Sequence, residues 1–210
     1  MTTWSNQGRT EVGMTLETPA ERDDSIVSFD DEPLILVDGD DRELGYLPKA
    51  EAHRGAGRLH RAFSLFVFNQ AGELLLQQRA AAKRLWPYYW SNSCCSHPRR
   101  GEPLDVAVER RLEQELGLRC DLHYLFKFQY QAQYDADGAE HEVCSVFVGR
   151  SHDRPRINAN EIKAIRYIGV DALDAELAAT PERFTPWFRI EWMRLRSEFP
   201  QLPASLAAAI

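Results

Sequence analysis

The chain has 210 residues, of which 44% are apolar and 27% charged, the balance of a soluble globular protein rather than a disordered or fibrous one. Its formal net charge of −7 argues against a broad nucleic-acid surface, because phosphate contacts need clustered Lys and Arg side chains. The sequence contains no run of about 18 apolar residues and no pattern of a secretory signal. We therefore expect a cytoplasmic protein without a membrane partner.

The length suits one domain with tails. Residues 1–31 show no sustained periodicity and are predicted to form a mobile tail, residues 32–199 the domain, and residues 200–210 a second tail. Two of the four cysteines are adjacent, which makes a poor disulfide framework, so we expect free thiols that serve catalysis or burial. These cysteines are Cys94, Cys95, Cys120 and Cys144.

The predicted elements begin with a strand over residues 33–37 and a helical turn after Pro48. Two apolar runs, 62–68 and 74–79, flank a four-residue turn and predict a hairpin. Further strands are predicted over 126–134, 142–148 and 164–168, and helices over 105–116 and 185–198. Because strands come as hairpins with helices between them, we expect an α+β fold, an α/β/α sandwich with a mixed sheet between helices.

The segment from Trp90 to Pro98 places a thiol two residues before an imidazole, at Cys95 and His97. Side chains alternate along an extended segment, so these two are predicted to point to one side and Cys94 to the other. One thiol is therefore expected beside a possible metal ligand.

Glu140 and Glu142 lie two residues apart in a predicted strand, so both carboxylates share one face while His141 takes the other. The strand continues with apolar residues, and two buried carboxylates repel unless a cation or a proton lies between them. Imidazole and carboxylate together suit Zn²⁺ or Mn²⁺. Three histidines could complete such a site: His53, His60 and His97. A solvated edge with surface histidines is the alternative, and the spacing leaves both open.

The helix over 105–116 resembles the helix of the Nudix family, whose pattern is Gly, five residues, Glu, seven residues, then Arg-Glu-apolar-x-Glu-Glu-x-Gly-apolar. The positions that fit are Glu102, Arg110, Leu112, Glu115, Gly117 and Leu118. Ser96 stands in place of the first Gly, and Arg111 and Gln114 replace two of the glutamates. Fewer carboxylates weaken the Mg²⁺-dependent hydrolysis of diphosphates, so the resemblance implies the fold and leaves hydrolysis as an alternative activity.

Four pieces, in order, are similar to the type 1 isopentenyl-diphosphate isomerases, a family of Nudix-fold enzymes, over roughly residues 33–196. They are 79–86 with Lys83, 91–98 with Cys-Cys-Ser-His-Pro, 138–143, and 185–188 with Thr-Pro-Trp-Phe. The resemblance implies that isopentenyl diphosphate is isomerised to dimethylallyl diphosphate by protonation and deprotonation through a tertiary carbocation. The rival hypotheses are a Nudix pyrophosphohydrolase of nucleoside or other diphosphates and a non-catalytic module that binds a metal or docks a partner.

The resemblance also implies roles for individual residues. Cys95 and Glu142 would transfer the protons on opposite faces of the substrate's double bond. The direction of each transfer is open. Trp187 would stabilise the cation and Tyr130 would bond the glutamate, although both residue types are also common in cores. The diphosphate would be held by Lys49, Arg79, Lys83, Arg111 and Ser96. Arg79 and Lys83 could equally belong to a solvated stretch.

Two metals are implied by the same resemblance. Glu115 and the backbone oxygen of Cys95 would hold Mg²⁺ at the diphosphate. The tighter site would hold one Mn²⁺ or Zn²⁺ on His53, His60, His97, Glu140 and Glu142. We expect a small-molecule substrate as the partner, no nucleic acid, and a monomer or a weak dimer.

Overall fold

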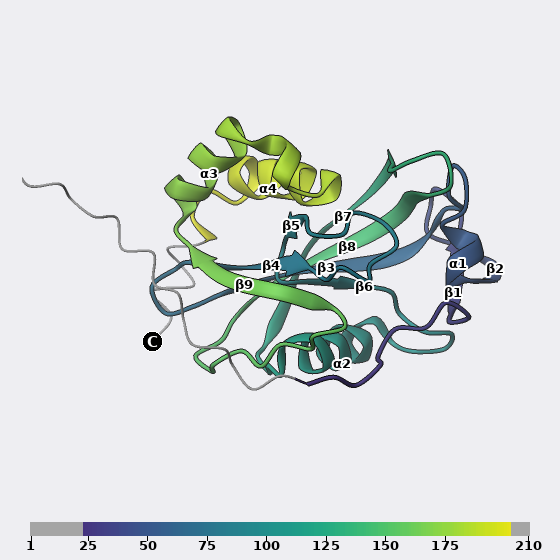
Figure 1. Ribbon diagram of the computed structural model, residues 1–210, viewed down its shortest axis with the longest axis horizontal. Helices are drawn as coiled ribbons and strands as arrows, with labels where there is room; N and C mark the ends of the chain where they lie inside the picture. Colours follow the sequence, from purple (N-terminus) through teal and green to yellow (C-terminus); the bar gives the residue numbers. More distant parts are fainter. Residues whose placement is uncertain (1–22, 203–210) are drawn as a thin grey trace, which may run out of the picture.

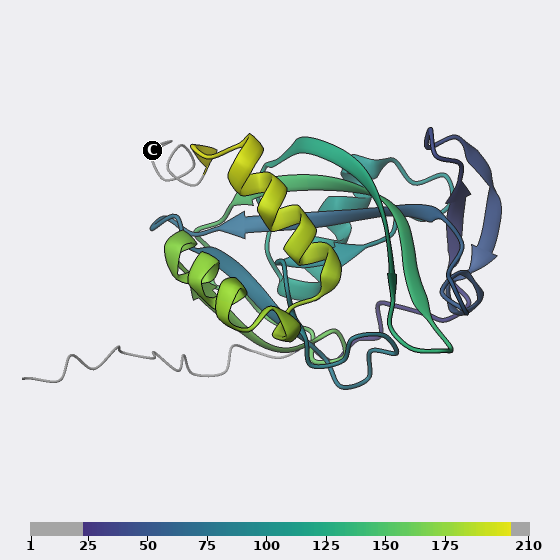
Figure 2. The same ribbon diagram turned by 90° about the horizontal axis from the view of Figure 1, so that it is seen from above.

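The computed structural model describes residues 23–202. Within them, a nine-stranded mixed β-sheet lies between helices, as expected from the sequence. Helices α3 (Val170–Ala179) and α4 (Pro186–Glu198) cover one face of the sheet, and α2 (Leu104–Leu116) covers the other (Figure 1). Figure 2 shows α4 crossing over the strands of the face that it covers.

The remaining elements follow the chain. The strands are β1 (Pro33–Val37), β2 (Glu43–Pro48), β3 (His60–Phe68), β4 (Leu74–Arg79), β5 (Trp90–Ser91), β6 (Cys94–Ser96), β7 (Leu122–Gln133), β8 (Ala139–Arg150) and β9 (Ile162–Ile168). A helical turn α1 (Lys49–Ala52) follows β2, and a 3₁₀ turn η1 (Pro181–Arg183) separates α3 from α4. None of the helices in the described range is long and apolar enough to cross a membrane.

The predicted strands and helices are all present, with ends shifted by a few residues. Two longer elements were missed, β2 and α3. All of β2 is exposed or half-buried and contains Gly45 at φ 146°, so its sequence shows no clear alternation. Helix α3 buries only Leu173, so its apolar residues give little periodic signal.

The pairing of β3 and β8 organises the centre of the sheet. These strands run parallel, with His60 opposite Glu142 at the start of the ladder. On its other side β8 pairs antiparallel with β7, where Tyr130 lies opposite Glu142. β3 also pairs antiparallel with β6, where Ser64 lies opposite Cys95. Four residues predicted for the site, His60, Tyr130, Cys95 and Glu142, are therefore brought onto adjoining strands.

Strand β3 is buried on both faces and separates two cores. Phe63 and Leu65 pack with α2, whereas Phe66 and Phe68 pack with α4. This division follows from the alternation of side chains along a strand whose residues after Arg61 are apolar except for Ser64. A third, smaller cluster is formed by Ile35 and Val37 of β1 with Val143 of β8.

Residues 23–31, the described part of the segment predicted as a tail, lie against the domain. Val27 is buried, and its carbonyl oxygen accepts a hydrogen bond of 2.7 Å from Arg111. The Asn158 side chain donates to the carbonyl of Ser25 at 2.8 Å. Contacts with the domain therefore begin before residue 32. Residues 1–22 and 203–210 lie outside the described range, and the mobility of both tails stays a prediction.

Gly149 in β8 gives a test of packing. A Cβ atom there would lie 2.8 Å from Sγ of Cys120 and 2.9 Å from the carbonyl oxygen of Asp121. The backbone oxygen has no rotamer by which to move away, so Gly149→Ala should lower the free energy of unfolding in urea by about 1–3 kcal/mol. Gly169→Ala is the control, because φ is −68° and its Cβ would meet no described atom within 4 Å. Equal unfolding free energies for the two variants would contradict this account.

Candidate active site

Five buried side chains converge at one end of the sheet. His53 follows α1, His60 begins β3, His97 follows β6, and Glu140 and Glu142 lie on β8. One ligand atom of each lies within 4.8 Å of those of the other four. The structure thus brings together the five residues predicted to bind the tighter metal, and the solvated-edge alternative is wrong for them.

Backbone hydrogen bonds orient two of the imidazoles. Nδ1 of His53 lies 2.7 Å from the carbonyl oxygen of Lys49, and Nδ1 of His60 lies 2.7 Å from that of Arg58. A carbonyl oxygen only accepts, so each Nδ1 carries the hydrogen and each Nε2 of a neutral ring has a free lone pair. Nε2 of His60 lies 3.2 Å from Nε2 of His97. The backbone therefore points imidazole lone pairs toward one centre, as in metal sites.

The contact between Glu140 and His53 needs a proton or a metal ion. Its Oε2 atom lies 2.8 Å from Nε2 of His53 but has no hydrogen-bond partner among the described residues. When the ring is neutral both atoms carry lone pairs, and the contact is repulsive unless a proton or a metal ion intervenes. Across the cluster, Oε1 of Glu142 lies 3.2 Å from Nε2 of His97. Two buried carboxylates and three imidazoles fit a divalent cation, whose charge neutralises both acids.

The pKa values of Glu140, Glu142 and His97 favour the forms that bind a metal, whereas the pKa of His53 is raised by Glu140 although burial would lower it. Burial alone would raise the pKa of Glu140 and of Glu142. The interaction of Glu140 with His53, and those of Glu142 with His60 and with the hydroxyl of Tyr130, nevertheless hold both pKa values below the usual one. Burial and the neighbouring His60 lower the pKa of His97 well below its ordinary value. At neutral pH both carboxylates are ionised and His97 is neutral.

A cavity of about 350 Å³ adjoins the cluster and is lined by Cys95 and Glu142. Burial raises the pKa of Cys95 to about 12, so the thiol holds its proton at neutral pH. Cys94 is fully buried in the core beneath α2, whereas Cys95 packs against the core beneath α4. The predicted alternation of Cys94, Cys95 and His97 is therefore confirmed.

Aromatic rings form part of the cavity wall. The Tyr130 hydroxyl donates a hydrogen bond of 2.7 Å to Oε2 of Glu142. Trp187, on α4, is buried with its ring centroid 6.2 Å from that of Tyr130 and 5.3 Å from that of Trp86. Both predicted aromatic residues thus face the cavity while they pack in the core, so the two interpretations of them are compatible.

The five residues predicted to hold a diphosphate all line this cavity: Lys49, Arg79, Lys83, Ser96 and Arg111. Arg79 donates to the carbonyl oxygens of Leu85 at 2.9 Å and Trp86 at 3.0 Å. Its guanidinium carbon lies 5.2 Å from the centroid of the Trp187 ring. Arg79 and Lys83 therefore belong to a cavity wall rather than to a solvated stretch.

Glu115 lies deeper than predicted for a ligand of a substrate-bound metal. It is 2% exposed and forms an ion pair with Arg111. It belongs neither to the five-donor cluster nor to the described residues that line the cavity. The Mg²⁺ role of Glu115 and of the Cys95 backbone oxygen stays a prediction.

Sequence reasoning missed several cavity residues. Val27 and Ser28 line the cavity although they fall in the segment predicted as a tail, and Ser28 accepts a hydrogen bond from Lys49. Glu161 also lines the cavity and forms ion pairs with Lys83 and Arg111. These residues lie in loops far along the chain from their partners, and no periodic pattern marks them.

Helix α4 carries a further buried acid, Glu191, one turn beyond Trp187. Glu191 is 0% exposed, its Oε1 atom accepts a weak hydrogen bond of 3.6 Å from Cys144, and its Oε2 has no partner among the described residues. Burial raises the pKa of Glu191 to about 8. This carboxyl is therefore mostly protonated at neutral pH.

The mixed sheet between helices carries a buried group of three histidines and two glutamates that is compatible with divalent metal binding. The family model described as NUDIX domain matches residues 58–188. A crystal structure of a protein from Deinococcus radiodurans is similar, with a TM-score of 0.58 and 23% identity over 70% of this chain and 90% of that one. That likeness shows the fold alone.

Comparison with curated proteins narrows the family. The chain is 42% identical to isopentenyl-diphosphate Delta-isomerase 1 of Photorhabdus laumondii over 81% of its own length and 99% of the relative. It is 42% identical to isopentenyl-diphosphate Delta-isomerase of Pectobacterium atrosepticum over 77% and 90% of the two chains. The chain therefore belongs to the isopentenyl-diphosphate Delta-isomerase family of Nudix-domain proteins, and the resemblance seen in its sequence is confirmed.

Glu191 makes the stability of the fold depend on pH. Because its pKa rises from 4.5 to about 8 on folding, the folded chain holds a proton that the unfolded chain has released in this window. This group therefore lowers the free energy of unfolding as pH rises from 4.5 to 8, by at most about 1.4 kcal/mol per pH unit. Glu191→Gln should remove this loss, so its advantage in urea unfolding should be larger at pH 8 than at pH 5.

Glu198→Gln is the matched control, since Glu198 lies on the same helix but is exposed and paired with Arg194. Its difference from the unmodified chain should be small and similar at both pH values. A Glu191→Gln advantage that does not grow with pH would show that the carboxyl is ionised in the folded state.

Proposed function

We propose that the protein interconverts isopentenyl diphosphate and dimethylallyl diphosphate. The main support is that Cys95 and Glu142 line one cavity with aromatic walls, beside cations that suit a diphosphate. Membership of the isomerase family supports the same reaction. The substrate is then a small molecule, and we expect a monomer or a weak dimer in the cytoplasm.

The chemical difficulty is the protonation of an unactivated alkene. In the proposed reaction a new C–H bond forms at the terminal carbon, and the electron pair of the double bond supplies it. A tertiary carbocation results, and removal of a proton from C2 places the double bond between C2 and C3. One proton enters and one leaves, so the charge of the product equals that of the substrate.

Cys95 and Glu142 are suited to these two transfers. The burial that raises the pKa of the Cys95 thiol keeps it protonated, whereas the lowered pKa of Glu142 keeps the carboxylate ionised. The free site therefore holds one protonated and one ionised group, and a reaction that adds one proton and removes another needs both states. The Tyr130 hydroxyl fixes the orientation of Glu142 through the hydrogen bond to Oε2.

The cation between the two transfers would react with any water in the cavity. Aromatic walls exclude water and stabilise positive charge without acting as nucleophiles. Trp187 would take this role, because its indole ring faces the cavity that Cys95 and Glu142 share.

The polar end of the substrate would lie among Lys49, Arg79, Lys83, Ser96 and Arg111. Binding there would orient the alkene between the thiol and the carboxylate. We propose Mn²⁺ or Zn²⁺ on His53, His60, His97, Glu140 and Glu142, and Mg²⁺ at the diphosphate near Glu115 and the Cys95 backbone oxygen. When bound, the first ion would lower the proton affinity of Glu142 and the second would neutralise phosphate charge.

Deuterium labelling tests the reaction itself. The protein with Mg²⁺ and Mn²⁺ or Zn²⁺ should convert isopentenyl diphosphate in deuterated water into dimethylallyl diphosphate with deuterium in a methyl group. The label enters because the proton of the acid exchanges with solvent. Proton and deuterium NMR would follow product and label. Release of phosphate without double-bond migration would favour the hydrolase, and no turnover would favour the metal-binding module.

The two adjacent cysteines should differ sharply. Cys95→Ala removes a proton-transfer group, and the isomerisation rate should fall at least about 10²- to 10⁴-fold in the same assay. Cys94→Ala is the matched control, because Cys94 lies in the opposite core and its loss should leave the rate within about tenfold. Thermal unfolding would confirm that both variants fold. A larger loss for Cys94→Ala would overturn the assignment.

A further inference from the structure

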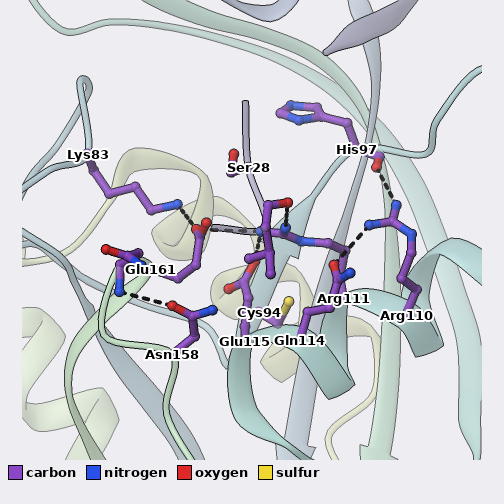
Figure 3. A network of polar contacts seen from close by, with 12 residues as sticks. Ser28, Lys83, Cys94, His97, Arg110, Arg111, Gln114, Glu115, Asn158 and Glu161 are labelled. Carbon is purple, nitrogen blue, oxygen red and sulfur yellow. Dashed lines mark hydrogen bonds and ion pairs between the residues drawn. The ribbon is translucent and has the colours of Figure 1, made fainter. Parts of the chain in front are cut away.

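Glu161 is a buried anion among the cations proposed to hold the diphosphate. It is 3% exposed, and its Oε2 atom forms an ion pair with Nζ of Lys83 and lies 3.5 Å from Nη2 of Arg111. Figure 3 shows Lys83 and Arg111 reaching this carboxylate from two sides. The carboxylate is thus paired with cations that a diphosphate would also need.

The backbone fixes the position of Glu161. Its N–H donates to the carbonyl of Asn158 at 3.1 Å, and its own carbonyl accepts from the N–H of Ala80 at 3.0 Å. Ala80 begins the loop that carries Lys83, so Glu161 joins this loop to the segment before β9 through both its main chain and its side chain.

The side chains of Arg111 and Lys83 differ in conformational freedom. Arg111 is 2% exposed and also donates to the carbonyl of Val27 and to Glu115, so its guanidinium is held on several sides. The Lys83 side chain is 22% exposed and lies on a loop between β4 and β5. A lysine stem has four rotatable bonds and no fixed geometry for its contacts. Lys83 is therefore the cation that can change partners.

We propose that Glu161 is an internal counter-anion that competes with the diphosphate for Lys83. In the free protein Lys83 pairs with Glu161, and in the complex its ammonium group turns to the phosphate oxygens. Glu161 touches no reacting carbon and is a positioning residue. The inference rests on the proposed function, because it takes the diphosphate as the group that enters the cavity.

The charge of Glu161 is permanent under ordinary conditions. Burial alone would raise its pKa, but Lys83 and Arg111 hold the pKa at about 2. In the free protein this anion also compensates buried positive charge, which would be costly if left unpaired.

The competition suits a reaction whose substrate and product carry the same diphosphate. Contacts with that group stabilise both equally, so they lower no barrier and slow the departure of product. When the diphosphate binds, Lys83 exchanges its ion pair with Glu161 for one with phosphate. The net contribution of Lys83 to the binding free energy is therefore small. Glu161 would thus keep the substrate oriented while limiting the affinity for product.

Glu161→Gln tests this competition, since it keeps the shape and removes the charge. Titration calorimetry with inorganic diphosphate and Mg²⁺ should show the Kd falling at least about tenfold, and the KM for isopentenyl diphosphate should fall with it. The free variant should melt at a lower temperature, because buried cations lose their partner. A purely structural role predicts the opposite change in affinity. Unchanged or weaker diphosphate binding by a folded Glu161→Gln variant would overturn the proposal.

Glu176→Gln is the matched control. Glu176 accepts a hydrogen bond of 2.8 Å from Arg166 in a partly buried ion pair outside the cavity, and its loss should leave the Kd unchanged. Lys83→Met should weaken diphosphate binding, and adding Glu161→Gln to it should then have a much smaller effect than in the unmodified chain. Additive effects would show that Glu161 does not act through Lys83.

Glu161→Asp keeps the buried charge if the amide variant fails to fold. The shorter side chain lies farther from Lys83, so the Kd should fall in the same direction but less, and a rise would overturn the proposal. Because diphosphate affinity is measured without turnover, failure here is distinct from failure of the proposed function. If the unmodified chain isomerises but the Glu161 variants bind diphosphate no more tightly, this inference is wrong and the proposed function stands.

Discussion

Two carboxylates buried side by side on β8 constrain the rest of the site. Glu140 and Glu142 are each 8% exposed and are held ionised by histidines and by the hydroxyl of Tyr130. Such a pair is tolerated in a protein interior only with compensating charge. The parallel ladder of β3 and β8 places His60 opposite Glu142, so the sheet itself sets the donor geometry.

The sheet also places cavity-lining side chains and core side chains on opposite faces. Alternation along β3 separates the two larger cores, and β6 follows the same alternation through its pairing with β3. Cys94 therefore joins an apolar core, while Cys95 reaches the cavity beside Glu142. Two chemically identical thiols differ in environment because a strand presents neighbouring residues to opposite faces.

How much could be predicted from the sequence depended on whether the signal was local. Cys95 with His97, and Glu140 with Glu142, could be assigned to shared faces because both pairs lie within one extended segment. Glu161 lies in a loop 78 residues from Lys83, and the contact depends on the pairing of β9 with β4. Val27 and Ser28 were missed because their segment shows no periodicity, although buried backbone contacts hold it in place.

The cavity borders two regions of opposite net charge, one acidic and one basic. Around Glu140 and Glu142 the chain supplies excess negative charge that a metal ion would satisfy, whereas Lys49, Lys83 and Arg111 supply excess positive charge for an anion. In the first region Oε2 of Glu140 lies 2.8 Å from Nε2 of His53 and has no hydrogen-bond partner among the described residues. In the second region Glu161 is an internal anion that pairs with Lys83 and Arg111. Under the proposed function, the diphosphate that leaves after each turnover meets a competing carboxylate, whereas a resident metal ion would meet only its own ligands.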